Sequence, residues 1–134
     1  MVAKDFKDLV VWQKAKLLVL DIYFITEKFP SNELYALTNQ FRRAAISIIA
    51  NIAEGFTRTT IKEKIKFYNI ALGSIQECRC FCILSTDLKY ADMASYEVQF
   101  TDLARMLNKY ISRIKENHSL NKQDPNSQLP TPNS

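Results

Sequence analysis

The sequence predicts an all-α protein, an antiparallel up-down four-helix bundle followed by a disordered C-terminal tail. Only two glycines and four prolines occur in 134 residues, and three of the prolines lie in the last ten residues. Turn-rich β-sandwiches and barrels need many more such residues. Apolar residues make up 47% of the chain, which is enough for one core without disulfides. They recur at helical spacing in four stretches joined by short loops, so neighbouring helices are expected to be antiparallel.

The first helix is expected over residues 8–29, with Asp8 as its N-cap. Its inward positions follow helical spacing: Leu9, Trp12, Val19, Ile22, Thr26 and Phe29. A second apolar stripe broadens the buried face beyond what one core needs: Val10, Leu17, Leu20 and Phe24. Excess apolar surface of this kind indicates a partner, and most simply other copies of the same chain.

The second helix is expected over residues 33–54, after Pro30-Ser31-Asn32 has ended the first helix and capped the next. Its inward positions are again apolar: Leu34, Leu37, Phe41, Ala44, Ala45, Ile48 and Ile52. Gly55 follows and fits the left-handed conformation that commonly closes a helix.

The third helix is expected over residues 60–88, opening on the capping-box pattern of Thr60 and Glu63. Its inward residues are Ile61, Ile65, Tyr68, Leu72 and Ile75. Gly73 lies in its interior, where glycine costs about 1 kcal/mol against alanine, and is best explained by a close helix approach.

The fourth helix follows Asp92 and carries a coiled-coil-like seam with spacing 4-3-4-3-4: Tyr96, Phe100, Leu103, Leu107, Tyr110 and Ile114. Residues 118–134 are rich in Asn, Ser, Gln and Pro and are expected to be disordered. The chain is therefore divided into a bundle domain, 1–117, and a tail, 118–134.

Residue types that carry out catalysis or bind cofactors are scarce. His118 is the single histidine, no Glu-x-x-His pattern occurs, and the two glycines are eighteen residues apart. These facts argue against a histidine triad, a di-iron site or a phosphate-binding glycine loop. Cys78, Cys80 and Cys82 cannot converge on one metal from a helix and are interpreted as small hydrophobes in a reducing compartment. We expect no metal, no cofactor and no enzyme activity.

The N-terminus lacks the apolar run of a signal peptide, and the uncharged stretch 44–53 is too short to span a bilayer. We therefore expect a soluble cytoplasmic protein without a membrane segment.

The net charge of +4 comes from 18 basic and 14 acidic residues, and all of it lies within residues 42–66. One part of this charge falls at the turn between the second and third helices and forms a candidate nucleic-acid-binding patch: Arg58, Lys62, Lys64 and Lys66. Thr57, Thr59 and Thr60 can add hydrogen bonds to phosphates. The alternative is an ordinary solvated turn.

A polar stripe interrupts the second helix, because Arg43, Ser47, Asn51 and Glu54 recur at +4, +4 and +3 and share a face. Antiparallel pairing brings Ser74 and Glu77 of the third helix within reach of Arg42 or Arg43. The stripe predicts either buried hydrogen bonds and an ion pair that fix the helix register, or a solvent-facing groove for a polar ligand.

Several motifs resemble a bacterial family of four-helix-bundle proteins encoded in 23S rRNA intervening sequences, also called S23 ribosomal proteins. The similarity covers residues 5–115. The motifs are Gln40-Phe41-Arg42-Arg43-Ala44-Ala45, Ser47-Ile48 and Asn51-Ile52-Ala53-Glu54-Gly55, with Phe6, Leu9, Val11-Trp12, Ala15, Phe29-Pro30, Glu33-Leu34-Tyr35-Ala36-Leu37, Ala71, Gly73-Ser74 and Glu77.

The resemblance implies a bundle that assembles as a ring-shaped homopentamer. The similar accessory protein of diversity-generating retroelements binds nucleic acid and works with a reverse transcriptase. Two functions follow from the residues and the resemblance together. The first is a non-catalytic oligomer that binds RNA or DNA through the basic patch at the turn between the second and third helices. The second is a protein-interaction scaffold, such as an accessory subunit to a reverse transcriptase.

Overall fold

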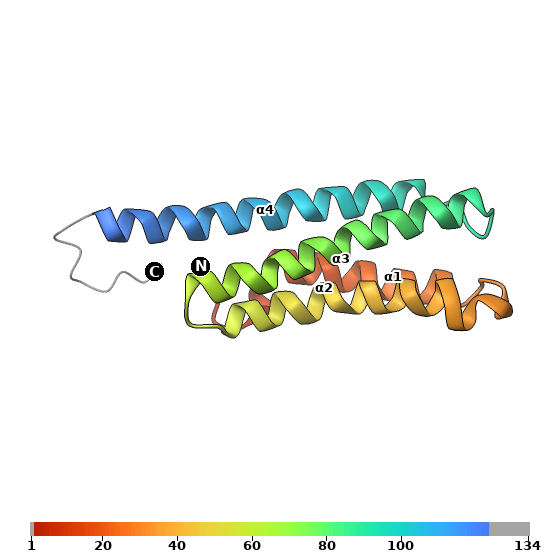
Figure 1. The fold of residues 1–134 in the computed structure, drawn as a ribbon, viewed down its shortest axis with the longest axis horizontal. Coiled ribbons are helices and arrows are strands. Elements are labelled where there is room, and N and C mark those ends of the chain that lie inside the picture. Colours follow the sequence, from red (N-terminus) through yellow and green to blue (C-terminus); the bar gives the residue numbers. More distant parts are fainter. Residues whose placement is uncertain (1, 124–134) are drawn as a thin grey trace.

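A computed structural model describes residues 2–123 of the chain. Four α-helices follow one another: α1 (Val10–Thr26), α2 (Asn39–Thr57), α3 (Ile61–Asp87) and α4 (Ala94–Gln123). They form the expected antiparallel bundle, in which α3 packs between α2 and α4 (Figure 1). The fold class predicted from the sequence is confirmed. None of the described helices is both long and apolar enough to cross a lipid bilayer.

The core is built from the apolar faces that helical spacing singled out. Ile22, Phe41, Tyr68 and Phe100 are completely buried, and each comes from a different helix. Trp12 lies at the edge of the core, where its indole Nε1 donates a hydrogen bond to the carbonyl of Ile49 at 3.2 Å. The inward faces of all four helices are thus largely as predicted.

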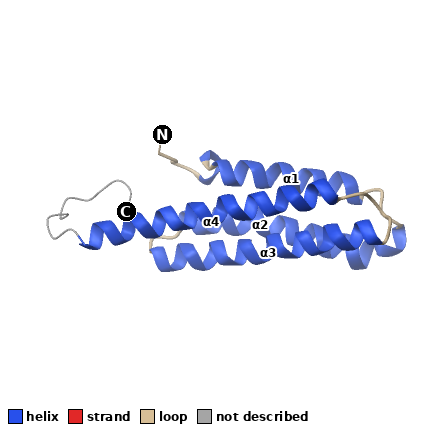
Figure 2. Ribbon diagram, turned by 90° about the horizontal axis from the view of Figure 1, so that it is seen from above, coloured by secondary structure: helices blue, strands red, loops and turns tan. Residues whose placement is uncertain are grey.

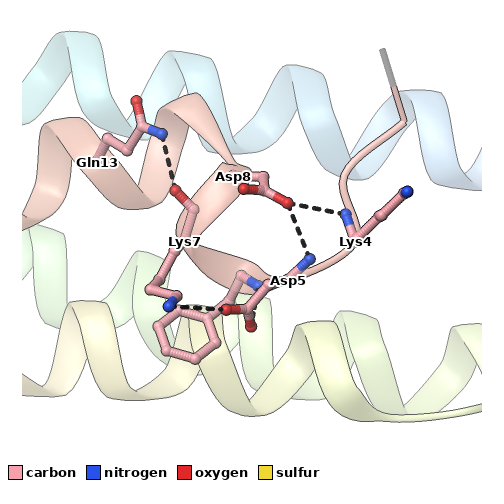
Figure 3. A network of polar contacts seen from close by, with 6 residues as sticks. Lys4, Asp5, Lys7, Asp8 and Gln13 are labelled. Carbon is pink, nitrogen blue, oxygen red and sulfur yellow. Dashed lines mark hydrogen bonds and ion pairs between the residues drawn. The ribbon is translucent and has the colours of Figure 1, made fainter.

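The beginning of α1 differs from the prediction that Asp8 caps it. Asp8 instead ends a short 3₁₀ turn, Phe6–Asp8, and α1 begins at Val10. The Asp8 carboxylate accepts hydrogen bonds from the backbone N–H groups of Lys4 and Asp5, at 3.0 and 3.1 Å (Figure 3). The acidic residue therefore closes a capping box around the preceding turn.

The beginning of the second helix also differs from the prediction. A 3₁₀ turn, Ser31–Glu33, and a π-helical turn, Leu34–Thr38, precede α2. Ala36 has a non-helical backbone there, with φ −122° and ψ −105°. This kink rotates the start of the segment, so Leu34 is exposed rather than inward. The segment is tied to the α3–α4 loop by Tyr90, whose hydroxyl donates to Glu33 at 2.6 Å.

The two glycines have roles opposite to those predicted. Gly55 is not a left-handed cap but a buried residue inside α2, which continues to Thr57. A Cβ at this position would lie 2.5 Å from Cε1 of Tyr68, so Gly55 permits the close helix approach. Gly73, which was expected to make such a contact, has open space around its Cβ position.

Helix α3 begins where the sequence predicted, whereas α4 extends further along the chain than predicted. The Thr60 hydroxyl accepts a hydrogen bond from the backbone N–H of Glu63 at 3.2 Å, which confirms Thr60 as the N-cap. The second bond of the predicted capping box, from the Thr60 N–H to the Glu63 carboxylate, is not formed among the described residues. Helix α4 continues through His118, where the tail was expected to begin, to Gln123. The remainder of the predicted tail, residues 124–134, lies outside the described residues.

Apolar side chains remain exposed on the outer faces of α1 and α3. Helix α1 lies along one edge of the bundle (Figure 2) and contacts α4 much less extensively than α2 contacts α3. Its second apolar stripe is 57–69% exposed: Val10, Leu17, Leu20 and Phe24. Helix α3 exposes Ile70, Ile83 and Leu84, and its C-cap residue Leu88 is also exposed, all to 43–51%. The surplus apolar surface predicted for the first helix is therefore present, and α3 carries one as well.

Candidate nucleic-acid interface

The four residues of the predicted basic patch fall into two pairs with different surroundings. Helix α2 ends at Thr57 and α3 begins at Ile61, so the turn places all four at one end of the bundle. Lys62 and Lys66 point into solvent, whereas Arg58 and Lys64 are partly buried. The difference follows from helical spacing, because Lys64 lies half a turn away from the other two lysines.

Lys64 interacts with the C-terminus of α2. Its amine donates hydrogen bonds to the carbonyls of Phe56 at 2.7 Å and Gly55 at 3.3 Å. A cation at this point also stabilises the negative end of the α2 dipole. Burial lowers the pKa of Lys64 from its ordinary value. Its contacts therefore serve the fold.

Arg58 is held by neighbours on both sides. Its guanidinium forms an ion pair with Glu54 at 3.2 Å and lies 4.8 Å from the ring centroid of Phe67. Thr57 completes this end of the helix by donating to the carbonyl of Glu54 at 2.8 Å. The charge of Arg58 is partly neutralised by Glu54, although its guanidinium still faces the turn.

The side-chain amines of Lys62 and Lys66 make no hydrogen bond or ion pair with any other described residue. The Lys66 amine lies 6.0 Å from the ring centroid of Phe67, at the outer limit of a cation–π contact. Since both amines are exposed and uncommitted, they are the members of the patch that are available to an anionic partner.

Helix α4 adds two basic residues that lie outside residues 42–66, the stretch that carries the net charge. Tyr110 packs its ring edge-on against Tyr68, with centroids 5.5 Å apart. This contact fixes how α3 and α4 align and brings the exposed Arg113 and Lys115 to the level of the first turns of α3. Figure 1 shows this part of α4 passing over the α2–α3 turn. In the sequence, the 4-3-4-3-4 spacing of apolar residues in α4, packed antiparallel to α3, is the pattern from which this position of Arg113 and Lys115 could have been predicted.

Arg42 belongs to a different part of the molecule from Ser74 and Glu77. Its Nε donates to the Thr26 hydroxyl at 2.8 Å, and its terminal nitrogen donates to the carbonyl of Tyr23 at 3.3 Å. The guanidinium also lies 4.8 Å from the centroid of the Tyr23 ring and 3.7 Å from the Glu27 carboxylate. Arg42 therefore joins α2 to the end of α1.

The centre of the polar stripe forms hydrogen bonds across α2 and α3. The hydroxyls of Ser74 and Ser47 lie 2.7 Å apart, and the amide of Asn51 donates to the Ser47 hydroxyl at 3.0 Å. Ser74 is buried. These contacts set one helix against the other at a fixed register, as one of the two interpretations of the stripe expects.

The outer part of the stripe is open. A groove of about 280 Å³ lies between α2 and α3, lined by Gln40, Arg43, Ser47, Ser74 and Glu77. Arg43 and Glu77 border it without forming an ion pair with each other or with another described residue. The stripe thus has hydrogen-bonded serines, Ser47 and Ser74, at the base of the groove and two unpaired charged side chains, Arg43 and Glu77, at its edge.

The cysteines give no metal centre. Cys78 and Cys82 are buried free thiols and Cys80 is an exposed one. Within the described residues, no group of three or more His, Cys, Asp or Glu side chains is arranged to hold a metal ion.

Comparison with known proteins identifies a family. Residues 7–113 match the model of the 23S rRNA-intervening sequence protein family. No curated protein matches the chain. Since the match covers most of the sequence and the whole of the bundle core, the chain belongs to the family of 23S rRNA-intervening sequence proteins.

Proposed function

We propose that this protein is a non-catalytic oligomer that binds RNA or DNA at the end of the bundle containing the α2–α3 turn. The observation that carries the proposal is the pair of exposed, uncommitted amines of Lys62 and Lys66 on the first turns of α3. Arg58 borders them, and Arg113 and Lys115 of α4 lie at the same level.

The arrangement suits phosphate groups better than individual bases. The side chains are long cations on helix surfaces, which can approach phosphates by charge alone and without a fixed hydrogen-bond geometry. One subunit offers few of them, so its affinity for a polyanion is modest. Several subunits in one assembly multiply the contacts and raise the avidity. Homo-oligomerisation is therefore part of the proposal, and a ring is the form that the family resemblance implies.

Binding to a structured RNA and to a DNA duplex of equal length, measured over a range of salt concentrations, tests the proposal. Replacing Lys62 and Lys66 together by alanine should weaken binding and lower the slope of log K against log salt by about 1.8 per subunit engaged. Replacing Lys28 and Lys89, at the other end of the bundle, provides a control of equal charge. No binding at low salt, or equal effects of the two double variants, would contradict the proposed surface.

The second candidate function is a protein-interaction scaffold, and the exposed stripe of α1 is the observation that favours it. Leu17, Leu20 and Phe24 are 57–69% exposed on one helix, and such surface commonly marks a protein contact. Serine at these three positions should abolish a scaffold contact and leave nucleic-acid binding by each subunit intact. A protein partner that stays bound to the serine variant would contradict this second function.

A further inference from the structure

The outer face of α3 contains a glycine that the subunit itself does not explain. Gly73 lies in the middle of a 27-residue helix, where glycine is less favourable than alanine by about 1 kcal/mol. Apart from its chain neighbours and the backbone of its own helix, no heavy atom lies within 4 Å of the position that its Cβ would occupy, and the residue is exposed. A close approach by another molecule would explain why this position has no side chain.

Gly73 is part of a regular seam that runs along this face. Exposed residues recur with spacing 4-3-4-3-4, the repeat of a helix that packs against another helix. They are Lys66, Ile70, Gly73, Glu77, Cys80 and Leu84. Ile70 and Leu84 are 43% and 44% exposed. Because the bundle core uses the opposite face of α3, this seam is a second, unpartnered packing surface.

The charges on the seam identify the partner. Lys66 lies on the N-terminal side of Gly73 and Glu77 on its C-terminal side, and neither is paired within the described part of the chain. A second α3 running in the opposite direction presents the complementary order. We propose that α3 pairs with α3 of a second copy of this chain, antiparallel and about a twofold axis near residues 71 and 72.

One register satisfies the charges and the glycine together. When Lys66 stands opposite Glu77 of the second copy, a step of four residues along each helix brings Ile70 opposite Gly73 of the second copy. The isoleucine side chain then fits the place where a Cβ is missing. Because the contact is isologous, each interaction occurs twice: two ion pairs and two Ile-on-Gly contacts.

This pairing goes beyond the proposed ring and is compatible with it. A ring is made by head-to-tail contacts between two different surfaces, whereas the α3 contact joins a surface to itself. The exposed stripe of α1 remains available for a ring, and the α3 contact can join two rings or two single subunits.

An exchange of charges tests the register. Lys66→Glu places two carboxylates opposite each other, and Glu77→Lys places two amines opposite each other, so each variant alone should lose the α3 contact. An equimolar mixture of the two variants should recover it, because each interface position then holds opposite charges. Sedimentation velocity without nucleic acid measures the masses. Loss of association in either variant without recovery in the mixture would overturn the register.

Substitution of Gly73 tests the same contact independently of charge. Since its Cβ position is open, Gly73→Ala should make the subunit more resistant to urea while weakening the association at least several-fold. Gly73→Leu should abolish the association with the helical content unchanged. Asn108→Leu, on the exposed face of α4, is the matched control and should leave the association unchanged. Association that is unaffected by Gly73→Leu would overturn the proposal, as would wild-type protein that shows no α3-dependent association at any concentration.

These measurements also separate this contact from the proposed nucleic-acid function. They contain no nucleic acid, so their failure leaves the binding proposal intact. Conversely, a protein that binds no nucleic acid can still show the exchange of charges and the opposite effects of Gly73→Ala.

Discussion

At the scale of single residues, Gly55 has no room for a side chain. A Cβ there would lie 2.5 Å from Cε1 and 2.8 Å from Cδ1 of Tyr68, a ring that is completely buried and cannot move aside. Gly55→Ala should therefore lower the free energy of unfolding by about 1–3 kcal/mol, because overpacking outweighs the gain in helix propensity. Urea unfolding measures the change. Gly73→Ala is the control and should act in the opposite direction, so equal effects of the two substitutions would contradict this account.

Buried thiols make the stability sensitive to alkaline pH. Burial, with the charge of Glu97, raises the pKa of Cys82 from 9.0 to about 12, and burial likewise raises the pKa of Cys78. Above pH 9 the unfolded chain releases these protons while the folded chain retains them, so stability falls as pH rises. Each thiol should contribute up to about 1.4 kcal/mol per pH unit between the two pKa values.

Urea unfolding between pH 8 and 10 measures this dependence. Cys82→Ala should make the fall less steep, whereas Cys80→Ala, at an exposed position, should leave its steepness unchanged. The account fails if the two variants have the same pH dependence as the wild-type protein, or if both flatten it equally.

The sequence predicted that glycines matter at residues 55 and 73 but assigned them the wrong roles. Local patterns show where a glycine lies on a helix, and Gly55 follows a motif that commonly ends one. The distance to Tyr68 depends on how α2 and α3 pack, which no local pattern contains. Lys64 is a similar case, because its bond to the Phe56 carbonyl exists only once α3 folds back on α2.

At the scale of helices, α1 depends on a few specific contacts with α2. Arg42 supplies three of them, to the Thr26 hydroxyl, the Tyr23 carbonyl and the Tyr23 ring. Arg42→Lys should lower the free energy of unfolding by about 1–3 kcal/mol, because an ammonium cannot make the same forked and stacked contacts and leaves polar groups without partners.

Arg43→Lys is the matched control, one residue along the same helix. The Arg43 side chain is exposed and makes no hydrogen bond or ion pair with another described residue, so this change should stay within about 0.5 kcal/mol. Urea unfolding compares the two variants, and hydrogen exchange at Tyr23 and Thr26 locates the effect. Equal losses for both variants would mean that Arg42 does not hold α1 to α2.

The order and inward faces of the helices could be predicted because burial imposes a period on the sequence. Helix starts were harder, since Asp8 and Glu33 both precede apolar runs but lie in 3₁₀ turns. Of the candidate site, the turn and the exposure of Lys62 and Lys66 follow from helical spacing. The position of Arg113 and Lys115 beside α3 depends on the Tyr68–Tyr110 contact between helices, so the seam of α4 indicates it only once α3 and α4 are aligned.

At the scale of the whole molecule, the two proposed surfaces share Lys66. In the α3 pair this amine faces Glu77 of the second copy, whereas in the nucleic-acid complex it faces a phosphate. One amine cannot form a full ion pair with Glu77 and with a phosphate at the same time, so binding of nucleic acid and pairing through α3 should oppose each other. Thermodynamic linkage then requires that each lowers the affinity for the other by the same factor.

Gly73→Leu separates the two events, because it removes the pairing without touching a basic residue. At a protein concentration where half of the wild-type subunits are paired, the variant should bind a structured RNA up to about twofold more tightly, the limit reached if paired subunits do not bind. At concentrations where the wild type is unpaired, the two proteins should bind equally. Fluorescence anisotropy with labelled RNA measures both regimes, and Asn108→Leu controls for the added leucine. Tighter binding by the variant at every concentration, or RNA that leaves the paired fraction unchanged in sedimentation, would show that Lys66 is not shared.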